Sequence, residues 1–143
     1  MKQSDIFWPT TAQVLLTLVV AVRMYYVRIA ELRSKRISPQ ALATSREATS
    51  LENVAAADNF RNLFEVPVLF FAVCPILYVT NGVTVLQLTL AWTFVVFRVS
   101  HSFIHVTYNR VMHRFHLFVL SMVCVFAMWA VFAIHLLRDM QSG

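Results

Sequence analysis

Polar and ionisable side chains interrupt apolar stretches of this chain at spacings that bring them together. Arg61, Asn62 and Glu65 open one such stretch, and their three- and four-residue separations place them on one helix face. Pro67 follows and removes an amide that a helix would use, so we expect a kink there. A charge at the bilayer centre costs roughly 2.5–3.5 kcal/mol on insertion scales. Several such residues therefore favour a polar binding site between helices.

A second polar set follows one stripe of a later apolar stretch. Arg98, His101, His105 and Tyr108 are separated by three, four and three residues, which is the period of a single helix face. The residues between them are largely apolar, as Phe103 illustrates. Four polar residues on one stripe predict that this helix lines a cavity.

Four apolar stretches must position these side chains. Each has about the 20 residues that a helix needs to cross a hydrocarbon core, and of the 143 residues 59% are hydrophobic and 13% charged. A soluble domain carries about 25% charged residues. We therefore predict one all-α domain over residues 1–143, an integral membrane four-helix bundle with spans at about 9–29, 60–78, 83–107 and 115–137.

The connections between the predicted spans differ in length. Thr80-Asn81-Gly82 is typical of a tight turn, and a short basic link runs from Asn109 to Arg114. A long polar segment, residues 31–58, joins the first two spans. Its Thr49-Ser50-Leu51-Glu52 fits a capping box, which predicts a helix that starts near Ser50 and continues unbroken into the second span.

The distribution of Lys and Arg predicts the orientation. Most basic residues lie on the side of the long segment and the basic link, which indicates that this side is cytoplasmic and both termini are non-cytoplasmic. The net charge of +5 then reflects the membrane surface rather than nucleic acid. The membrane is a bacterial inner membrane or the endoplasmic reticulum. Alternate threading places all the embedded polar residues in the cytoplasmic half, Arg23 among them.

Other interpretations of these residues remain open. Arg61 and Glu65 alone could form a pair that steadies a helix end. His101 and His105, four residues apart, could bind a metal ion with Glu65 or His116, or a haem, although the surrounding arginines oppose a cation. The chain could also be a non-catalytic lipid-binding protein or a purely structural bundle.

The chemistry of the polar set suits glutathione, which has two carboxylates, one ammonium and one thiol. Arginine binds carboxylate through its planar fork, and Glu65 would receive the ammonium. A nearby arginine favours thiolate over thiol and lowers the thiol pKa from about 8.5. The surrounding bilayer would supply a lipophilic electrophile as the second substrate.

The sequence resembles the MAPEG family, the membrane-associated proteins in eicosanoid and glutathione metabolism. The resemblance rests on Arg61-Asn62-x-x-Glu65 with a proline soon after, on Arg98-x-x-His101, and on a basic residue leading into the fourth span. The four-span layout, the chain length and the long first loop also fit, so the resemblance covers most of the chain.

The resemblance implies a homotrimer of four-helix protomers that binds glutathione as co-substrate between protomers. It implies that Arg114 stabilises the thiolate, and that glutathione is held by Arg61, Asn62, Glu65, Arg98, His101 and Arg23. The helical stripe, not the resemblance, adds His105 and Tyr108 to the glutathione-binding candidates. The better-known enzymes of the family tend to carry tyrosine at the position of His105. The implied activity is glutathione transfer to a lipophilic electrophile or reduction of a lipid hydroperoxide.

Overall fold

The structure, a computed structural model, describes residues 1–36 and 54–142. A short 3-10 helix, η1 (Gln3–Ile6), leads into α1 (Phe7–Lys35). The remaining helices are α2 (Val54–Asn62), α3 (Val66–Val79), α4 (Val85–Val106) and α5 (Val111–Ser142). No strand occurs in this part of the chain. The all-α prediction is therefore confirmed, and each predicted span coincides with one helix or with the α2–α3 pair.

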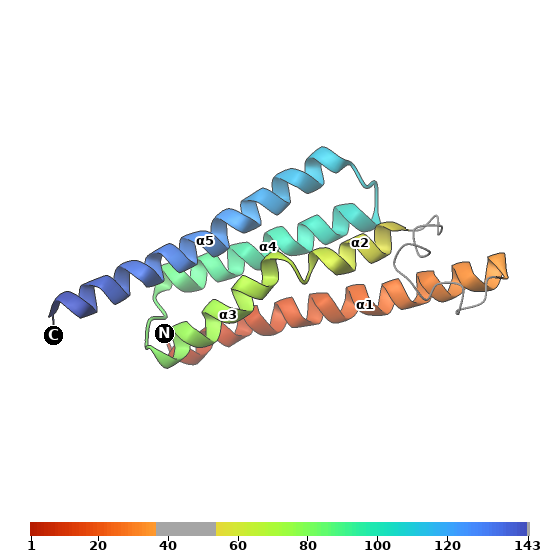
Figure 1. The fold of residues 1–143 in the computed structure, drawn as a ribbon. Helices are drawn as coiled ribbons and strands as arrows, with labels where there is room; N and C mark the ends of the chain where they lie inside the picture. The colour runs from red at the N-terminus through yellow and green to blue at the C-terminus, as the bar shows by residue number, and fades with distance from the viewer. Residues whose placement is uncertain (37–53, 143) are drawn as a thin grey trace.

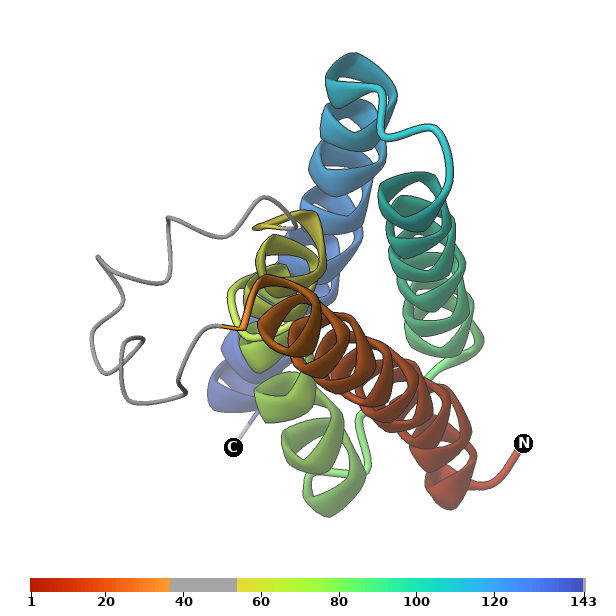
Figure 2. The same ribbon diagram turned by 90° about the vertical axis from the view of Figure 1, so that its right-hand side faces the viewer.

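The helices form an elongated antiparallel bundle (Figure 1). The α3–α4 turn and both termini lie at one end, and the link between α4 and α5 lies at the other (Figure 1). The α4 and α5 helices form the most extensive pair, and α1 packs against α2 and α4. Seen along the bundle, α1 and α5 lie on opposite sides of the α2–α3 pair (Figure 2).

Three segments are long and apolar enough to span a membrane: Gln3–Lys35, Ala55–Val79 and Val111–Arg138. The α4 helix has 22 residues and is roughly 33 Å long at 1.5 Å per residue, which also suffices to cross. It is not among the three apolar segments because its polar stripe, Arg98, His101 and His105, lowers its hydropathy. The outward faces of the bundle carry large apolar side chains, as expected for contact with lipid.

Local sequence explains where the helices end. Thr84 caps α4, its hydroxyl accepting a hydrogen bond from the Gln87 amide at 3.2 Å. Asn81 and Asn109 adopt positive φ values of 53° and 47° in the two short connections, a conformation that asparagine tolerates. The tight turn at Thr80-Asn81-Gly82 is confirmed. The predicted helix start near Ser50 lies outside the described residues.

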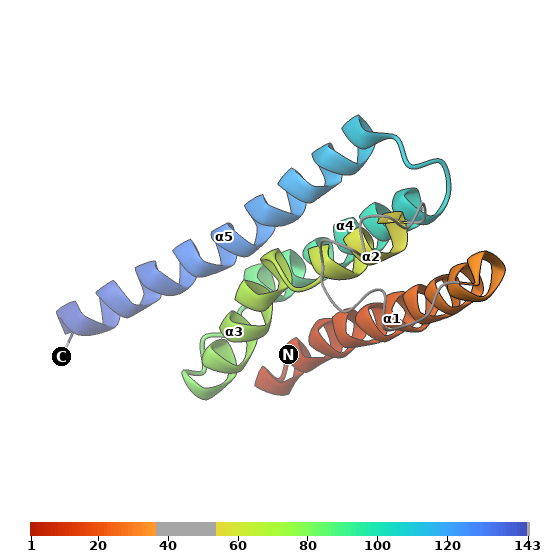
Figure 3. The ribbon, with the colours of Figure 1, turned by 45° about the vertical axis from the view of Figure 1, so that its right-hand side comes forward.

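The second span is broken rather than kinked. The α2 helix ends at Asn62, residues 63–65 form turns, and α3 begins at Val66 with Pro67 in its first turn (Figure 3). Pro67 has no amide to continue the helix. The expected kink is therefore a complete interruption, and the shared helical face expected for Arg61 and Glu65 is wrong because the helix between them is lost.

The interior of the bundle divides along its length into an apolar and a polar half. Phe70 and Phe94 stack with their ring centroids 4.4 Å apart in a cluster built mainly from α3, the first half of α4 and the middle of α5. Most buried polar side chains lie in the other half, whereas Gln13 and Gln87 are buried in the mainly apolar half. Those of the polar half are Glu31, Asn59, Arg98, His101, Ser102 and His105. The predicted gathering of polar residues towards one end of the bundle is thus found in the fold.

Candidate functional site

The break between α2 and α3 creates an acceptor for the most buried cation. Because the helix stops at Asn62, its carbonyl oxygen has no amide donor four residues later. Arg98 Nη2 donates a hydrogen bond to this oxygen at 2.6 Å. The interrupted helix and the polar stripe of α4 are therefore joined at one point.

Arg98 is fully buried with most of its hydrogen-bonding capacity unused. Its side chain is 0% exposed, and its Nε and Nη1 atoms have no partner among the described residues. Its guanidinium carbon lies 5.9 Å from the ring centroid of Phe118, and Glu65 acts on it electrostatically. A buried cation without an ion pair is costly, so this arrangement favours an anionic ligand.

The two histidines of the stripe differ in the hydrogen-bonding role of their buried Nε2 atoms. His101 Nδ1 lies 2.9 Å from the Arg114 carbonyl oxygen. Because a carbonyl oxygen only accepts, Nδ1 carries the proton, and Nε2 of the neutral ring is an acceptor. His105 Nδ1 lies 3.5 Å from Arg114 Nη1, a donor, so its Nε2 carries the proton. Both Nε2 atoms are buried, with no partner in the part of the chain that the structure describes.

Arg114 enters the site from the first turn of α5. Its Nη1 donates to Asn109 Oδ1 at 2.6 Å in addition to approaching His105. The side chain is half-buried, so its guanidinium is held in position while part of it remains accessible. This tether fixes the cation at the mouth of the polar half of the bundle.

A cavity of about 190 Å³ opens beside these groups. Its polar wall brings together four of the predicted site residues. Its apolar wall comes from the first turns of α5. Phe115 on that apolar wall is more than half exposed. The lining residues are Asn62, Glu65, His101, Arg114, Val111, Phe115 and Phe118.

Five predicted residues are not part of the cavity wall. Arg98 and His105 are buried behind it, and the other three lie further away. Arg61 is exposed and pairs with Asp58 at 3.8 Å. Tyr108 lies beyond the end of α4, exposed, with its hydroxyl 3.2 Å from His113 Nδ1. The expected stripe therefore ends at His105. Arg23, half-buried on α1, acts on His105 only through its charge.

Two buried polar residues of this region were missed from the sequence. Asn59 is 1% exposed with both amide atoms unpartnered, and Ser102 is 3% exposed with an unpartnered hydroxyl. Asn59 precedes Asn62 by one helical turn, and this spacing could have identified it as a residue on the same helix face. Ser102 adjoins His101 but lies off the predicted stripe, so no signal marked it.

Metal ligation finds little support in these positions. Over residues 1–36 and 54–142, no group of three or more His, Cys, Asp or Glu side chains could hold a metal ion. The site instead combines cationic and neutral donors, from Arg98, Arg114 and His105, with a few acceptors, among them His101 Nε2 and the Glu65 carboxylate. Such a set suits an anionic organic molecule better than a cation.

Comparison with known proteins gives one match. The sequence model of the MAPEG family matches residues 6–134 of the chain. No curated protein and no solved structure matches it.

Proposed function

Since the chain belongs to the MAPEG family, we propose that it is a membrane-bound glutathione-dependent transferase or peroxidase acting on a lipophilic electrophile. The observation that carries the proposal is the cavity of about 190 Å³, whose wall includes both Arg114 and Glu65. The buried Arg98 lies close to this wall. The cavity wall combines the Arg114 cation, the Glu65 carboxylate and apolar side chains, and Arg98 contacts two lining residues, Asn62 and Phe118, from behind.

The donor set fits glutathione group by group. Arg98 has two nitrogens, Nε and Nη1, whose N–H groups are unused among the described residues, and His105 has one, Nε2; these donors suit carboxylate oxygens. Glu65 is exposed at the cavity and can receive the ammonium group. The buried, unpartnered atoms would gain hydrogen bonds that they lack in the protein alone, and such gains stabilise a complex.

Arg114 is the residue that we assign to the sulfur. A fixed guanidinium near the thiol stabilises the thiolate, which is the nucleophile. In transfer, the sulfur forms a bond to the electrophilic carbon while the leaving group departs with its electron pair. The positioned cations and the proximity of both substrates would supply most of the acceleration.

The apolar wall indicates where the second substrate would enter. Val111, Phe115 and Phe118 face the cavity opposite its polar residues, and the exposed part of Phe115 lies on the outside of the bundle. A lipophilic molecule could therefore approach laterally from the bilayer and meet the sulfur at the boundary between the two walls.

One protomer does not provide a complete pocket. Small-molecule pockets usually measure about 300–1,000 Å³, and this cavity of about 190 Å³ is smaller. We therefore propose that a neighbouring protomer completes the site in a homotrimer. Arg61, exposed on α2, would then reach glutathione from the outside of its own protomer.

One observation favours a non-catalytic alternative. Arg114 already donates to Asn109 at 2.6 Å, so its charge is partly engaged within the chain. If that bond persisted with ligand present, the protein would bind glutathione or lipid without activating the thiol.

A combined binding and turnover experiment separates these possibilities. Purified protein in detergent would be titrated with glutathione by calorimetry, then assayed with a lipophilic aryl halide and with a lipid hydroperoxide. Saturable binding with turnover supports the proposal, whereas binding alone supports the alternative. Absence of binding at millimolar glutathione would overturn both.

A further inference from the structure

A second polar cavity lies at the end of the bundle opposite the candidate site. It measures about 290 Å³ and is enclosed by α3, α4 and α5 with the turn between α3 and α4. Gln87, on its wall, and His101, in the first site, are 14 residues apart on α4, or about 21 Å along the helix. The residues lining this second cavity are Leu77, Gly82, Thr84, Gln87, Val131, Phe132, Ile134, His135 and Arg138.

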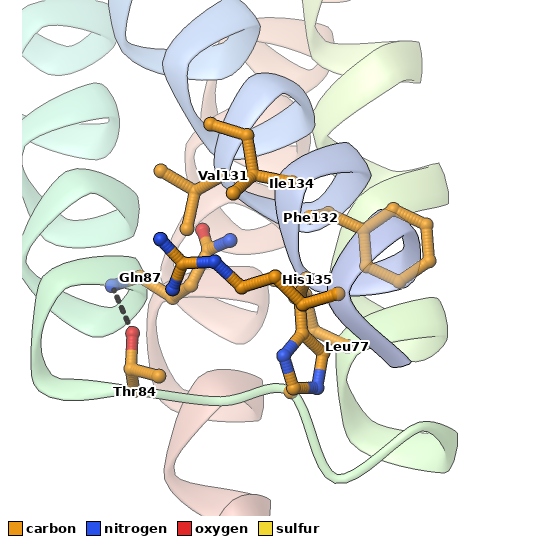
Figure 4. Close-up of a pocket in the computed structure, with 9 residues that line it drawn as sticks. Leu77, Thr84, Gln87, Val131, Phe132, Ile134 and His135 are labelled. Carbon is orange, nitrogen blue, oxygen red and sulfur yellow. Dashed lines mark hydrogen bonds between the residues drawn. The ribbon is translucent and has the colours of Figure 1, made fainter. Parts of the chain in front are cut away.

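The cavity has an apolar side and a polar side. Val131, Phe132 and Ile134 of α5 line it together with Gln87 of α4 and Thr84, the N-cap of α4; Figure 4 shows how these residues lie. Arg138 and His135 add basic side chains one turn further along α5. The cavity lies at the end of membrane-spanning helices and has one apolar and one basic side. It therefore suits a molecule that has an apolar body and an anionic polar end.

Gln87 supplies the second, independent indication of a ligand. Its side chain is 1% exposed, and its Nε2 donates to the Met128 carbonyl oxygen at 3.0 Å. That bond orients the amide, and Oε1 is left buried with no donor among residues 1–36 and 54–142. An unsatisfied buried acceptor is costly, so a ligand here should carry an N–H or O–H group in addition to its negative charge.

We propose that this cavity binds a phospholipid headgroup in which the phosphate is accompanied by a hydrogen-bond donor, such as phosphatidylethanolamine. Arg138 contacts the phosphate, the ammonium donates to Gln87 Oε1, and the start of the acyl chains lies along Val131 and Ile134. The positive end of the α4 dipole, at Thr84, adds to the attraction for phosphate.

The donor requirement can be tested without altering the protein. Retention of phosphatidylethanolamine and phosphatidylcholine by the detergent-solubilised protein would be compared by native mass spectrometry. Both lipids carry the phosphate, but only phosphatidylethanolamine has N–H groups. We expect about fivefold stronger retention of phosphatidylethanolamine, the effect of one hydrogen bond. Equal retention would overturn the role assigned to Gln87.

The phosphate contact is tested with Arg138→Gln and a matched control. Arg110→Gln removes an exposed cation at the opposite end of the bundle. We expect Arg138→Gln to weaken lipid retention about tenfold and Arg110→Gln to leave it unchanged. Equal effects of the two variants would contradict a specific site at this end.

A displacement experiment tests whether the ligand is a lipid rather than a free headgroup. Glycerophosphoethanolamine has the same headgroup without acyl chains, so it should fail to displace the bound lipid at equal concentration. Displacement would show that the apolar wall contributes nothing, and would overturn the assignment to a lipid. Neither arm involves glutathione, so the result is independent of the proposed function.

Discussion

Arg98 uses only Nη2 of its three guanidinium nitrogens, in the hydrogen bond to the carbonyl oxygen of Asn62. The side chain is buried, and Glu65 acts on it through its opposite charge. A protein keeps such an uncompensated cation at a cost in stability. We interpret this cost as the consequence of a site preorganised for carboxylate.

Replacing this side chain should therefore separate binding from stability. We expect Arg98→Met to raise the dissociation constant for glutathione by at least about tenfold, because a charge-assisted hydrogen bond is lost. The thermal unfolding temperature should change little, since an unpaired buried charge is removed with it. Calorimetry and a thermal melt in detergent measure the two effects.

Arg33→Met provides the control for this variant, because Arg33 is an exposed cation on α1. It should alter neither property. Unchanged glutathione affinity in Arg98→Met would show that Arg98 is a structural residue and not part of a binding site.

Among the helices, the broken second span determines the geometry of the site. The interruption at residues 63–65 frees the Asn62 carbonyl for Arg98 and leads into α3, whose Pro67 prevents repair of the break. Glu65, within the break, is thereby placed on the cavity wall. A continuous helix would use that carbonyl internally.

Restoring the missing amide should weaken the site. In Pro67→Ala, the new N–H can bond to the Leu63 carbonyl and favour a continuous helix. We expect higher helicity by circular dichroism and a roughly fivefold loss of glutathione affinity, from the lost Arg98–Asn62 bond.

Pro75→Ala is the matched control, since Pro75 lies inside α3, where the helix continues through it. It should leave glutathione affinity unchanged. Equal affinity in the Pro67 variant and the native chain would mean that the break does not position the site.

Replacing either of two buried glutamines by leucine should change the free energy of unfolding, in opposite directions. Gln13 on α1 is 0% exposed with both amide atoms unpartnered, whereas Gln87 ties α4 to α5 through Met128. Gln13→Leu should raise the free energy of unfolding by about 1–2 kcal/mol, because an unpaired amide is removed. Gln87→Leu should lower it by a similar amount. Denaturation in mixed micelles measures both, and destabilisation by Gln13→Leu would reveal a partner for its amide.

Sequence was sufficient for the helices but not for their contacts. Hydropathy located the four helical segments because a span needs a long apolar run. The stripe from Arg98 to His105 was predicted from its helical spacing, yet its extension to Tyr108 was wrong because α4 ends at Val106. The hydrogen bond between Arg98 and the Asn62 carbonyl could not be predicted. It depends on where the helix before Pro67 stops, and the position of Pro67 alone does not specify that residue.

At the scale of the whole molecule, the fold separates an apolar from a polar half, and both termini lie at the apolar end (Figure 1). The sidedness of this arrangement is a prediction from the Lys and Arg distribution. Both native cysteines, Cys74 and Cys124, are free and buried, which allows the prediction to be tested by labelling introduced cysteines.

Exposed positions at the two ends should react from opposite sides of the membrane. A membrane-impermeant maleimide added outside intact cells or sealed microsomes of known orientation should distinguish Ser4→Cys and Gln141→Cys from Arg110→Cys. The first two are expected to react from the non-cytoplasmic side and the third from the cytoplasmic side. The reverse pattern would contradict the orientation, and the cysteines of the native chain provide the background.

The central claim is that Arg114 stabilises a glutathione thiolate in the cavity between α2, α4 and α5. The most direct measurement is the ultraviolet difference absorbance of the thiolate during a glutathione titration, for the native chain and for Arg114→Gln. We predict saturable thiolate formation in the native protein and its loss in the variant, with binding of glutathione retained in both. Equal thiolate formation in the two proteins, or none in the native chain, would contradict the account.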